Sequence, residues 1–552
     1  MAEELLFVLI PALPLVWGLL ALWPTARRLV AAGGALPAFP ALVAAAVLPN
    51  GAGASTPWLL LGAEWALEPG MRALLAASAL VWAMAGLYAR GYLGGQSHRW
   101  RFDLFFHLTM AGNLGLLVAT DPATFYTLFA LMSLASYGLV VHTGTGAARR
   151  AGRIYLVMAM LGEVALLAGL VGVAIGHEEF WPALALGLAI KAGVIPLHVW
   201  LPLAHPVAPV PASAVLSAAM IKAGLVGWLR FPPPVTEIEF WGTVLMILGG
   251  FGALAAAGVG LTQRRPKEVL AYSSVSQMGV MVAALGAAWT QPGLAIPLQA
   301  AVIAYAVHHA LTKGTLFLVI GWLDRGGGMA ARVVLAAGAL VMAGLPATGG
   351  AAAKALLKEP LARLPEGAGL AAALLTLSGL ATATLMVRLW VVVRSTRDQA
   401  TQDRATEPPP RSMVVATVAV AVAMVVVPLV WGPLAAGLTD PLGKGLFEAM
   451  TPLLLAMVLG AWLFRWRGDE PWGPSVPPGD LLALLPRWWN RIEPCRPQMR
   501  GAARRRRRVS QVVARVSGGV RRAEAHLASW GGLGLALGAV LLLLAATVAV
   551  AG

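Results

Sequence analysis

The chain has 552 residues, of which 59% are hydrophobic and 12% are charged, and its formal net charge is +16. This composition excludes a water-soluble globular protein, in which about 25% of the residues are charged. The single cysteine, Cys495, excludes an internal disulfide framework and an iron–sulfur cluster, which needs about four thiolates. The sequence also has no phosphate-binding loop and no dinucleotide-binding glycine motif.

Apolar runs long enough to cross a membrane recur from residue 4 to residue 550. Because a hydrocarbon core of about 30 Å takes about 20 helical residues, we predict about 16 membrane spans. Backbone groups inside a bilayer must be satisfied within the span, so we predict an all-α polytopic membrane protein. The first run, Leu5 to Trp23, is expected to be a retained helix rather than a signal peptide. The expected spans are 4–23, 28–48, 71–90, 103–119, 121–142, 154–176, 182–202, 210–230, 238–261, 267–289, 295–322, 333–357, 368–393, 412–436, 448–464 and 530–550.

Most of the 41 lysines and arginines lie in one set of alternating loops between these spans. By the positive-inside rule those loops are cytoplasmic, which places the chain in the inner membrane with both termini in the periplasm. The longest basic loop, 465–528, includes a run of five arginines from Arg504 to Arg508. We expect this segment either to lie near anionic lipid or to grip a partner subunit as an amphipathic helix, and neither alternative involves nucleic acid.

Ionisable side chains inside the expected spans are the residues with the most information about function. They are costly at bilayer depth and usually mark an ion path or a buried pair. A lysine removed from water can give up its proton, and histidine titrates near neutral pH. As alternatives, a lysine can bond backbone carbonyls, Arg388 can reach back to the interface, and a single histidine can be a satisfied core residue. The set comprises Glu163, Lys191, His198, Lys222, His308, His309, Lys313, Lys354 and Arg388.

Two of these lysines adjoin expected helix breaks. Lys191 precedes Pro196 in LAIKAGVIPLHVWLPLAHPVAPVPAS, and Lys354 follows Pro346 in AGLPATGGAAAKALLK. Proline removes a backbone donor and opens the helix at mid-membrane. Broken helices in corresponding halves of a chain indicate an inverted-repeat transporter with a site at the membrane midplane, although kinks tolerated for packing are an alternative.

Four segments that follow one another along the chain resemble the successive signatures of the antiporter-like membrane subunits. They read KAGVIPLHVWLPLAHPVAPVPASAVLSAAMIKAG, QRRPKEVLAYSSVSQMG, HHALTKGTLFL and GLPATGGAAAKALLK. The family comprises the three large proton-pumping subunits of respiratory complex I, the matching subunits of membrane-bound hydrogenases and the large subunits of Mrp-type sodium/proton antiporters. The resemblance covers about residues 70–395.

The resemblance implies two inverted five-helix repeats, each with a broken helix and each forming a half-channel. The expected parts are N-terminal helices at 1–102, the first repeat at 103–230, the second repeat at 231–394, C-terminal helices at 395–466, a basic amphipathic cytoplasmic segment at 467–529 and a final anchor helix at 530–552. In layout, the last two parts are similar to the lateral helix and anchor of the longest such subunits.

The resemblance also implies roles for individual residues. Lys191 matches the lysine of the first broken helix, and Lys222 matches the lysine of the helix that follows. His309 and Lys313 match an HxxxK pair. Lys354 matches the lysine of the second broken helix. His205 resembles the histidine of an LPxAHP turn, and we include it among the expected proton-relay residues.

Two positions depart from the family pattern. Ala130 stands where the family has a glutamate that pairs with the lysine equated with Lys191, and Gln277 stands where a histidine or glutamate follows the YSS turn. Glu163 is the only acidic residue of the first repeat that lies at a depth comparable to that of Lys191. We therefore expect Glu163 to be the counter-ion of Lys191 and a member of the relay; a protonated acid within the core, or a pair with Lys222, is the alternative.

These observations predict a proton- or cation-translocating subunit of a multi-subunit membrane complex. We expect no catalytic centre, cofactor or metal in this chain, although the complex could be an oxidoreductase of the NADH-quinone or hydrogenase type. The expected partners are other membrane subunits, membrane lipid, H⁺ or Na⁺, and a cytoplasmic protein. Three alternatives remain: a proton-coupled partner in an inorganic-carbon uptake complex, a stand-alone secondary transporter, and a structural subunit that does not conduct.

Overall fold

The computed structural model describes residues 2–365, 367–400, 408–432, 434, 444–468, 470–473 and 476–479. Within these residues, eleven helices are long and apolar enough to cross a membrane, and shorter apolar helices lie at Leu36–Val47 and Gly328–Ala343. The predicted helical, polytopic character is therefore confirmed for the described residues, which are mostly helical with one short two-stranded sheet, whereas the predicted count of about 16 spans is not. Most of the expected basic segment and all of the expected anchor helix lie outside the described residues.

The N-terminal part of the chain contains the only strands among the described residues. Its elements are α1 (Ala2–Leu20), α2 (Arg27–Ala32), α3 (Phe39–Val47), β1 (Gly53–Thr56), β2 (Ala63–Ala66) and α4 (Pro69–Tyr92). The expected span 28–48 is not one helix, because α2 ends before Gly33 and a 3₁₀ turn precedes α3. A Cβ at Gly86 of α4 would lie 2.2 Å from the carbonyl oxygen of Gly34, so the interrupted segment passes too close to α4 for any larger residue there.

The next part of the chain holds the first helix break. Its helices are α5 (Arg99–Leu116), α6 (Pro122–Val140), α7 (Gly146–Ala174), α8 (Trp181–Ala192), α9 (Trp200–Val207), α10 (Val210–Val215) and α11 (Lys222–Arg230). Asp121 caps α6 by accepting a hydrogen bond from the backbone N–H of Thr124, and Thr145 caps α7 in the same way. Helix α7 packs against α6 and α8, which brings the residues around Glu163 next to those around Lys191.

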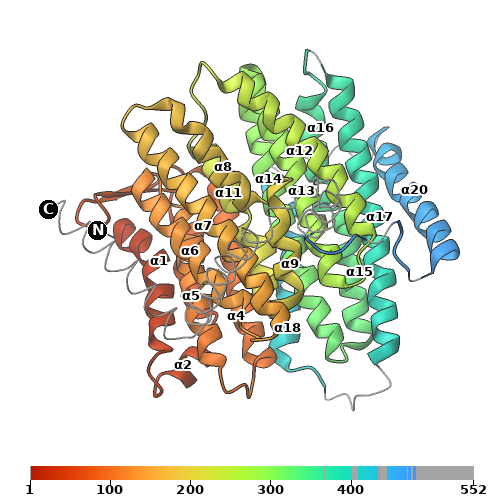
Figure 1. Ribbon diagram of the computed structural model, residues 1–552, viewed down its shortest axis with the longest axis horizontal. Coiled ribbons are helices and arrows are strands. Elements are labelled where there is room, and N and C mark those ends of the chain that lie inside the picture. Colours follow the sequence, from red (N-terminus) through yellow and green to blue (C-terminus); the bar gives the residue numbers. More distant parts are fainter. Residues whose placement is uncertain are drawn as a thin grey trace, which may run out of the picture. The chain divides into compact units, whose positions relative to one another are not determined.

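The second break lies in the part that follows. The helices are α12 (Ile238–Leu261), α13 (Pro266–Thr290), α14 (Ala295–Asp324), α15 (Gly328–Ala343), α16 (Gly349–Leu361), α17 (Ala368–Ala400), α18 (Arg411–Val430) and α20 (Lys444–Arg467). In Figure 1, α12 and α13 run side by side. A Cβ at Gly279 would lie 2.6 Å from the carbonyl oxygen of Gly249, so glycines let these two backbones approach closely.

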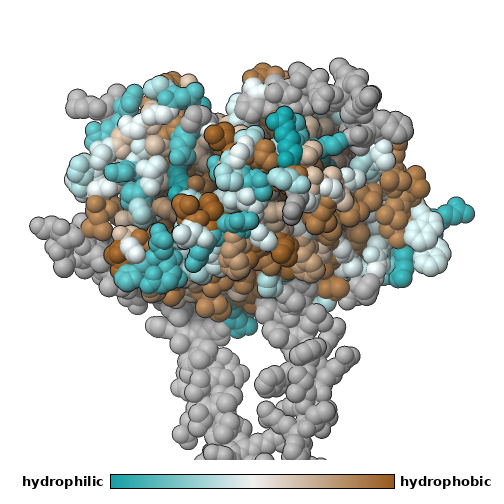
Figure 2. Space-filling view, turned by 90° about the horizontal axis from the view of Figure 1, so that it is seen from above, coloured by the Kyte–Doolittle hydropathy of each residue, from teal (hydrophilic) through white to brown (hydrophobic). Residues whose placement is uncertain are grey.

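The helices differ in how much of their surface is covered. In each of the spans Val210–Arg230 and Pro266–Thr290, 94% of the most apolar stretch of 18 residues is buried, so these helices lie inside the bundle. In Arg411–Val430 only 33% is buried, and the outward residues are apolar. Figure 2 looks onto one end of the helices and shows hydrophilic side chains next to hydrophobic ones on that face. Lys222 and Gln277 therefore lie on covered helices rather than on a lipid-facing surface.

Candidate functional site

Both expected helix breaks are present, and each carries a lysine. Helix α8 ends at Ala192, and Gly193 follows in the left-handed region with φ +70°. Helix α15 ends at Ala343, and Gly344 follows with φ +90°. Both positions favour glycine because a Cβ is strained at positive φ. Lys191 lies in the last turn of the helix before the first break, whereas Lys354 lies near the start of the helix after the second.

Lys191 is surrounded by aromatic rings. Its side chain is only 5% exposed, and its Nζ lies 5.6 Å from the ring centre of Phe129 and 5.9 Å from those of Tyr155 and Trp200. Aromatic faces attract a cation through their quadrupole, and the attraction is stronger away from water. Trp200 is itself held by a hydrogen bond from its ring N–H to the carbonyl oxygen of Ile190. The three rings thus partly replace the water that the ammonium group loses.

Glu163 and Lys191 line the same small cavity. Its volume is about 10 Å³, close to the least that holds one water molecule, and Ser133 and Tyr155 contribute hydroxyl groups to its wall. Glu163 is 7% exposed, and its Oε2 has no hydrogen-bond partner within the described part of the chain. Tyr155 bonds Ser136 and donates a hydrogen bond to the carbonyl oxygen of Ser133. The carboxyl group therefore has a free acceptor atom beside the cavity that Lys191 also reaches.

Lys222 contacts His309 directly. Its Nζ lies 2.7 Å from His309 Nδ1 and donates a hydrogen bond of 2.9 Å to the carbonyl oxygen of Ser217. Both side chains are fully buried. Lys222 is the first residue of α11, and only Ile221 separates it from a π-helical turn at Leu216–Met220; such wide turns occur frequently at functional sites. Lys222 thus makes the bond to a backbone carbonyl that was expected as an alternative, and it also contacts a second titratable group, His309.

Lys313 and His308 extend this buried polar group along α14. Lys313 donates hydrogen bonds to the carbonyl oxygen of Leu270 at 2.9 Å and to the hydroxyl group of Ser273. His308 lies one residue before His309, and a Cβ at Gly349 would be 3.3 Å from its Nδ1. Because Gly349 begins α16, His308 lies against the start of the helix that carries Lys354.

Lys354 closes the second break. Its Nζ donates a hydrogen bond of 2.8 Å to the carbonyl oxygen of Ala343, the last residue of α15. A cation at the C-terminal end of a helix satisfies a free carbonyl and is favoured by the helix dipole. A Cβ at Gly344 would lie 2.8 Å from this Nζ, so the glycine also makes room for the lysine. The break and the lysine therefore form one local unit.

The two departures from the family pattern lie in different surroundings. Ala130 is half-buried, and the residues of α6 that line the cavity are its neighbours Phe129 and Ser133. Gln277 is buried and held at both ends of its amide: it donates to the hydroxyl group of Thr382 at 2.7 Å and accepts from that of Tyr305 at 2.6 Å. Two hydrogen bonds thus hold Gln277 in the core, and its amide group does not titrate near neutral pH.

The sequence had suggested that Arg388 reaches back to the membrane interface, but the structure places its side chain in the interior. It is fully buried and donates to the carbonyl oxygen of Gln263 at 2.9 Å and to that of Glu470 at 3.0 Å. Its guanidinium group lies 5.4 Å from the ring centre of Trp472. Arg388 therefore joins α17 to the loop after α12 and to the segment 470–473, which is a structural role.

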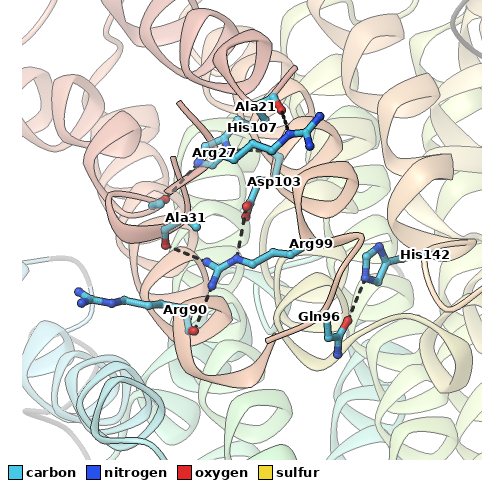
Figure 3. A network of polar contacts seen from close by, with 10 residues as sticks. Ala21, Arg27, Ala31, Arg90, Gln96, Arg99, Asp103, His107 and His142 are labelled. Carbon is cyan, nitrogen blue, oxygen red and sulfur yellow. Dashed lines mark hydrogen bonds and ion pairs between the residues drawn. The ribbon is translucent and has the colours of Figure 1, made fainter. Parts of the chain in front are cut away.

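Sequence reasoning missed a buried acidic residue, Asp103, whose position at the expected start of a span gave no sign of burial. It is 4% exposed and lies 3.3 Å from Arg99, which also donates to the carbonyl oxygens of Ala31 and Arg90. Figure 3 shows these bonds together with His107, whose Nδ1 lies 2.7 Å from the carbonyl oxygen of Asp103. The cluster ties α2, α4 and α5 together.

Comparisons with known proteins show the family of this chain. Residues 180–396 match the family described as NADH:quinone oxidoreductase/Mrp antiporter, TM. The NADH-quinone oxidoreductase subunit N of Desulforudis audaxviator is 32% identical in an alignment that covers 60% of this chain and 72% of that protein. The chain belongs to this family. It is thus an antiporter-like membrane subunit, and the matched region contains every expected relay lysine, whereas Glu163 and Ala130 precede it.

Other relatives of this antiporter-like subunit are longer than the matched part. An uncharacterized protein of Mycobacterium tuberculosis is 33% identical over 53% of this chain and 52% of that protein. Hydrogenase-4 component B of Escherichia coli is 33% identical over 42% of this chain and 38% of that protein. The chain thus spans about half the length or less of these curated relatives.

Two solved structures have the same fold as this antiporter-like subunit. The Mrp complex from a Dietzia species matches with a TM-score of 0.67 and 23% identity, over 95% of this chain and 63% of that chain. The membrane-bound sulfane sulfur reductase, an archaeal respiratory membrane complex, matches with a TM-score of 0.62 and 18% identity, over 83% of this chain and 99% of that chain. At this identity the likeness concerns the fold alone.

Proposed function

We propose that this antiporter-like subunit conducts protons, or Na⁺, across the inner membrane through a relay of buried lysines and histidines. The observation that carries the proposal is the contact of 2.7 Å between Lys222 and His309, both fully buried. Two cationic groups at this distance repel each other strongly away from water, so only one of them holds an extra proton at a time. A proton can therefore be passed between them. The proposed relay comprises Glu163, Lys191, His205, Lys222, His309, Lys313 and Lys354.

The two lysines at the helix breaks are proposed to serve as the ends of the relay. Lys191 lies beside a cavity of about one water, and Lys354 is bonded to the open end of α15. Broken helices at membrane depth are tolerated where they line a water-filled or polar path. We infer that each belongs to one half-channel, in inverted repeats at 103–230 and 231–394. The further assignments of about 16 spans and of periplasmic termini rest on hydropathy and on the positive-inside rule.

We place the subunit in a larger assembly. The relatives include parts of NADH-quinone oxidoreductase and hydrogenase-4, and the similar folds belong to an Mrp complex and a respiratory complex. On this basis the proposed partners are other membrane subunits, with lipid or a cytoplasmic protein contacting the basic segment 467–529. The driving force would come from those partners, since the proposed role of this chain is conduction rather than catalysis.

The proposal is tested by ion flux through the assembled complex. The complex is purified through a tag on this chain and reconstituted in liposomes, and a potassium diffusion potential drives flux that an internal pH dye or sodium dye reports. Lys191→Met and Lys354→Met should each assemble but lower the flux about tenfold or more, because a proton-relay group is lost. Lys358→Met, one turn beyond Lys354 on an exposed face of α16, is the matched control and should conduct normally. Full flux through either relay variant would exclude that lysine as an obligatory step.

A second candidate function is a structural subunit that kept the fold and lost conduction. Gln277 favours it, because a glutamine held between Thr382 and Tyr305 cannot pass a proton at a position where relatives carry a titratable residue. The same flux assay separates the two functions. A complex that assembles with the parent chain, carries its partners and shows no flux above empty liposomes would select the structural role.

A further inference from the structure

His205 is a buried histidine whose ring makes no hydrogen bond within the part of the chain that the structure describes. It lies near the end of α9 and is fully buried. Within the described residues neither Nδ1 nor Nε2 has a hydrogen-bond partner. Buried polar groups are normally satisfied, so a ring with two free nitrogens calls for an explanation. In its neutral form an imidazole has one N–H and one lone pair, and can take up a proton at one nitrogen while it releases one at the other.

The position of His205 relative to Lys313 follows from two contacts on α14. The His205 ring stacks on Phe317, with ring centres 4.6 Å apart and an angle of 22° between the planes. Phe317 is four residues after Lys313, so the two side chains lie on the same face of α14, one turn apart. His205 is therefore next to the turn of α14 that carries the buried Lys313.

The position of His205 relative to Lys267 follows from a bond to its own chain segment. Lys267 Nζ donates a hydrogen bond of 2.7 Å to the carbonyl oxygen of Ala208, three residues after His205. Ser213 donates to the carbonyl oxygens of both His205 and Ala208, which holds this short segment in one shape.

The three residues form a series from the surface to the interior. Lys267 is half-buried and follows the exposed Arg264 and Arg265 at the start of α13. His205 and Lys313 are both fully buried. Lys313 in turn bonds Ser273, two helical turns from Lys267 on the same helix. The bond of Lys267 to Ala208 and the stacking of His205 on Phe317 thus place His205 near a half-buried lysine and near a lysine of the proposed relay.

We propose that Lys267 and His205 form the access path by which protons pass between the surface at Arg264 and Arg265 and the buried Lys313. Lys267, as an ammonium group, gives a proton to the ring nitrogen of His205 that holds a lone pair. The other ring nitrogen gives its proton to the neutral amine of Lys313. Lys267 is then a neutral amine that takes a proton from water, and His205 remains neutral in its other tautomer until it turns back. This inference rests on the proposed function, because it supplies the relay with protons.

Cysteine labelling tests whether His205 is reached from that surface, and it does not depend on transport. The only cysteine of the chain is first removed by Cys495→Ser, and His205→Cys or Ala204→Cys is then added to the full chain in its complex. Ala204 is the matched control because it is fully buried on the same turn of α9. A membrane-impermeant methanethiosulfonate applied to the side that holds Arg264 and Arg265 should label His205→Cys and leave Ala204→Cys unlabelled. Equal labelling of both, no labelling, or labelling of His205→Cys from the opposite side would overturn the access path.

Flux through the reconstituted complex tests the chemistry. His205→Asn keeps a polar side chain without a second exchangeable nitrogen and should lower proton flux about tenfold or more. Lys267→Gln and Lys267→Arg should both lower it severalfold, because Arg keeps the charge and the bond to Ala208 but does not release a proton. Parent-like flux in His205→Asn overturns the proposal, and parent-like flux in Lys267→Arg removes Lys267 from the path and leaves it as an anchor. If the parent complex itself conducts nothing, the proposed function fails, and the labelling result alone decides whether the path exists.

Discussion

Lys222 and His309 touch each other in the interior, with Nζ 2.7 Å from Nδ1, although 87 residues separate them in the sequence. One side chain comes from the first residue of α11 and the other from the middle of α14. The remaining ring nitrogen of His309 has no hydrogen-bond partner within the described residues. His309 Nε2 is therefore a position at which a proton can be exchanged with a water molecule or side chain that comes within hydrogen-bond distance.

The Lys222 and His309 contact should make their mutations non-additive. Lys222→Leu and His309→Leu should each lower flux about tenfold or more, and the double variant should be no slower than the slower single variant. The reason is that removal of either group already interrupts the same proton transfer. Flux through all four proteins in one liposome preparation gives the coupling directly. Losses that multiply would show two independent roles and contradict a shared step.

Glu163 should be needed because it faces Lys191 across the small cavity. Glu163→Gln removes the negative charge and should lower flux, and Ala130→Glu in that background should restore part of it by returning a carboxylate from α6. Glu179→Gln is the matched control, since the Glu179 side chain is 67% exposed and lies outside the cavity. The pairing is wrong if Glu163→Gln conducts like the parent while Lys191→Met does not.

Arg388 should contribute to stability rather than to flux. Arg388→Met leaves the buried carbonyl oxygen of Gln263 without this donor, at a cost of about 1–3 kcal/mol, and also removes the partly buried bond to the carbonyl oxygen of Glu470. We expect a clearly lower Tm of the detergent-solubilised complex, measured by tryptophan fluorescence. Arg264→Gln, which breaks the exposed ion pair with Glu470, should cost less than about 1 kcal/mol. An unchanged Tm in Arg388→Met would show that these bonds do not hold the segment in place.

The orientation in the membrane should follow the arginines. Alkaline phosphatase fused after Gly144 should be inactive, because the adjacent Arg149 and Arg150 are expected in the cytoplasm. The same enzyme fused after Gly176, before the acidic Glu178, should be active in the periplasm. A fluorescent reporter that folds only in the cytoplasm, fused at both points, should give the reverse pattern. If both reporters place the Gly144 loop in the periplasm, the orientation and the periplasmic termini are wrong.

Much of the fold could be predicted from the sequence because it depends on local chemistry. Long apolar runs must be helical in a bilayer, and the structure has such helices. The breaks beside Lys191 and Lys354 were predicted from prolines and glycines, which act on their own backbone whatever surrounds them. At Gly33 the local signal was weaker. One span was predicted at 28–48, but the chain forms two helices there, α2 and α3.

The sequence alone determined the class of protein, the positions of the breaks and the lysines and histidines proposed for the relay, but not the burial of Asp103 and His107. Only the tertiary structure decided which of them meet: Lys222 with His309, Glu163 with the cavity of Lys191, and His205 with the turn of Lys313. The physical reason is that hydropathy and backbone preference act within one helix, whereas a contact depends on which faces of separate helices pack together. For the same reason the burial of Asp103 and the bonds of Arg388 left no mark on the local sequence.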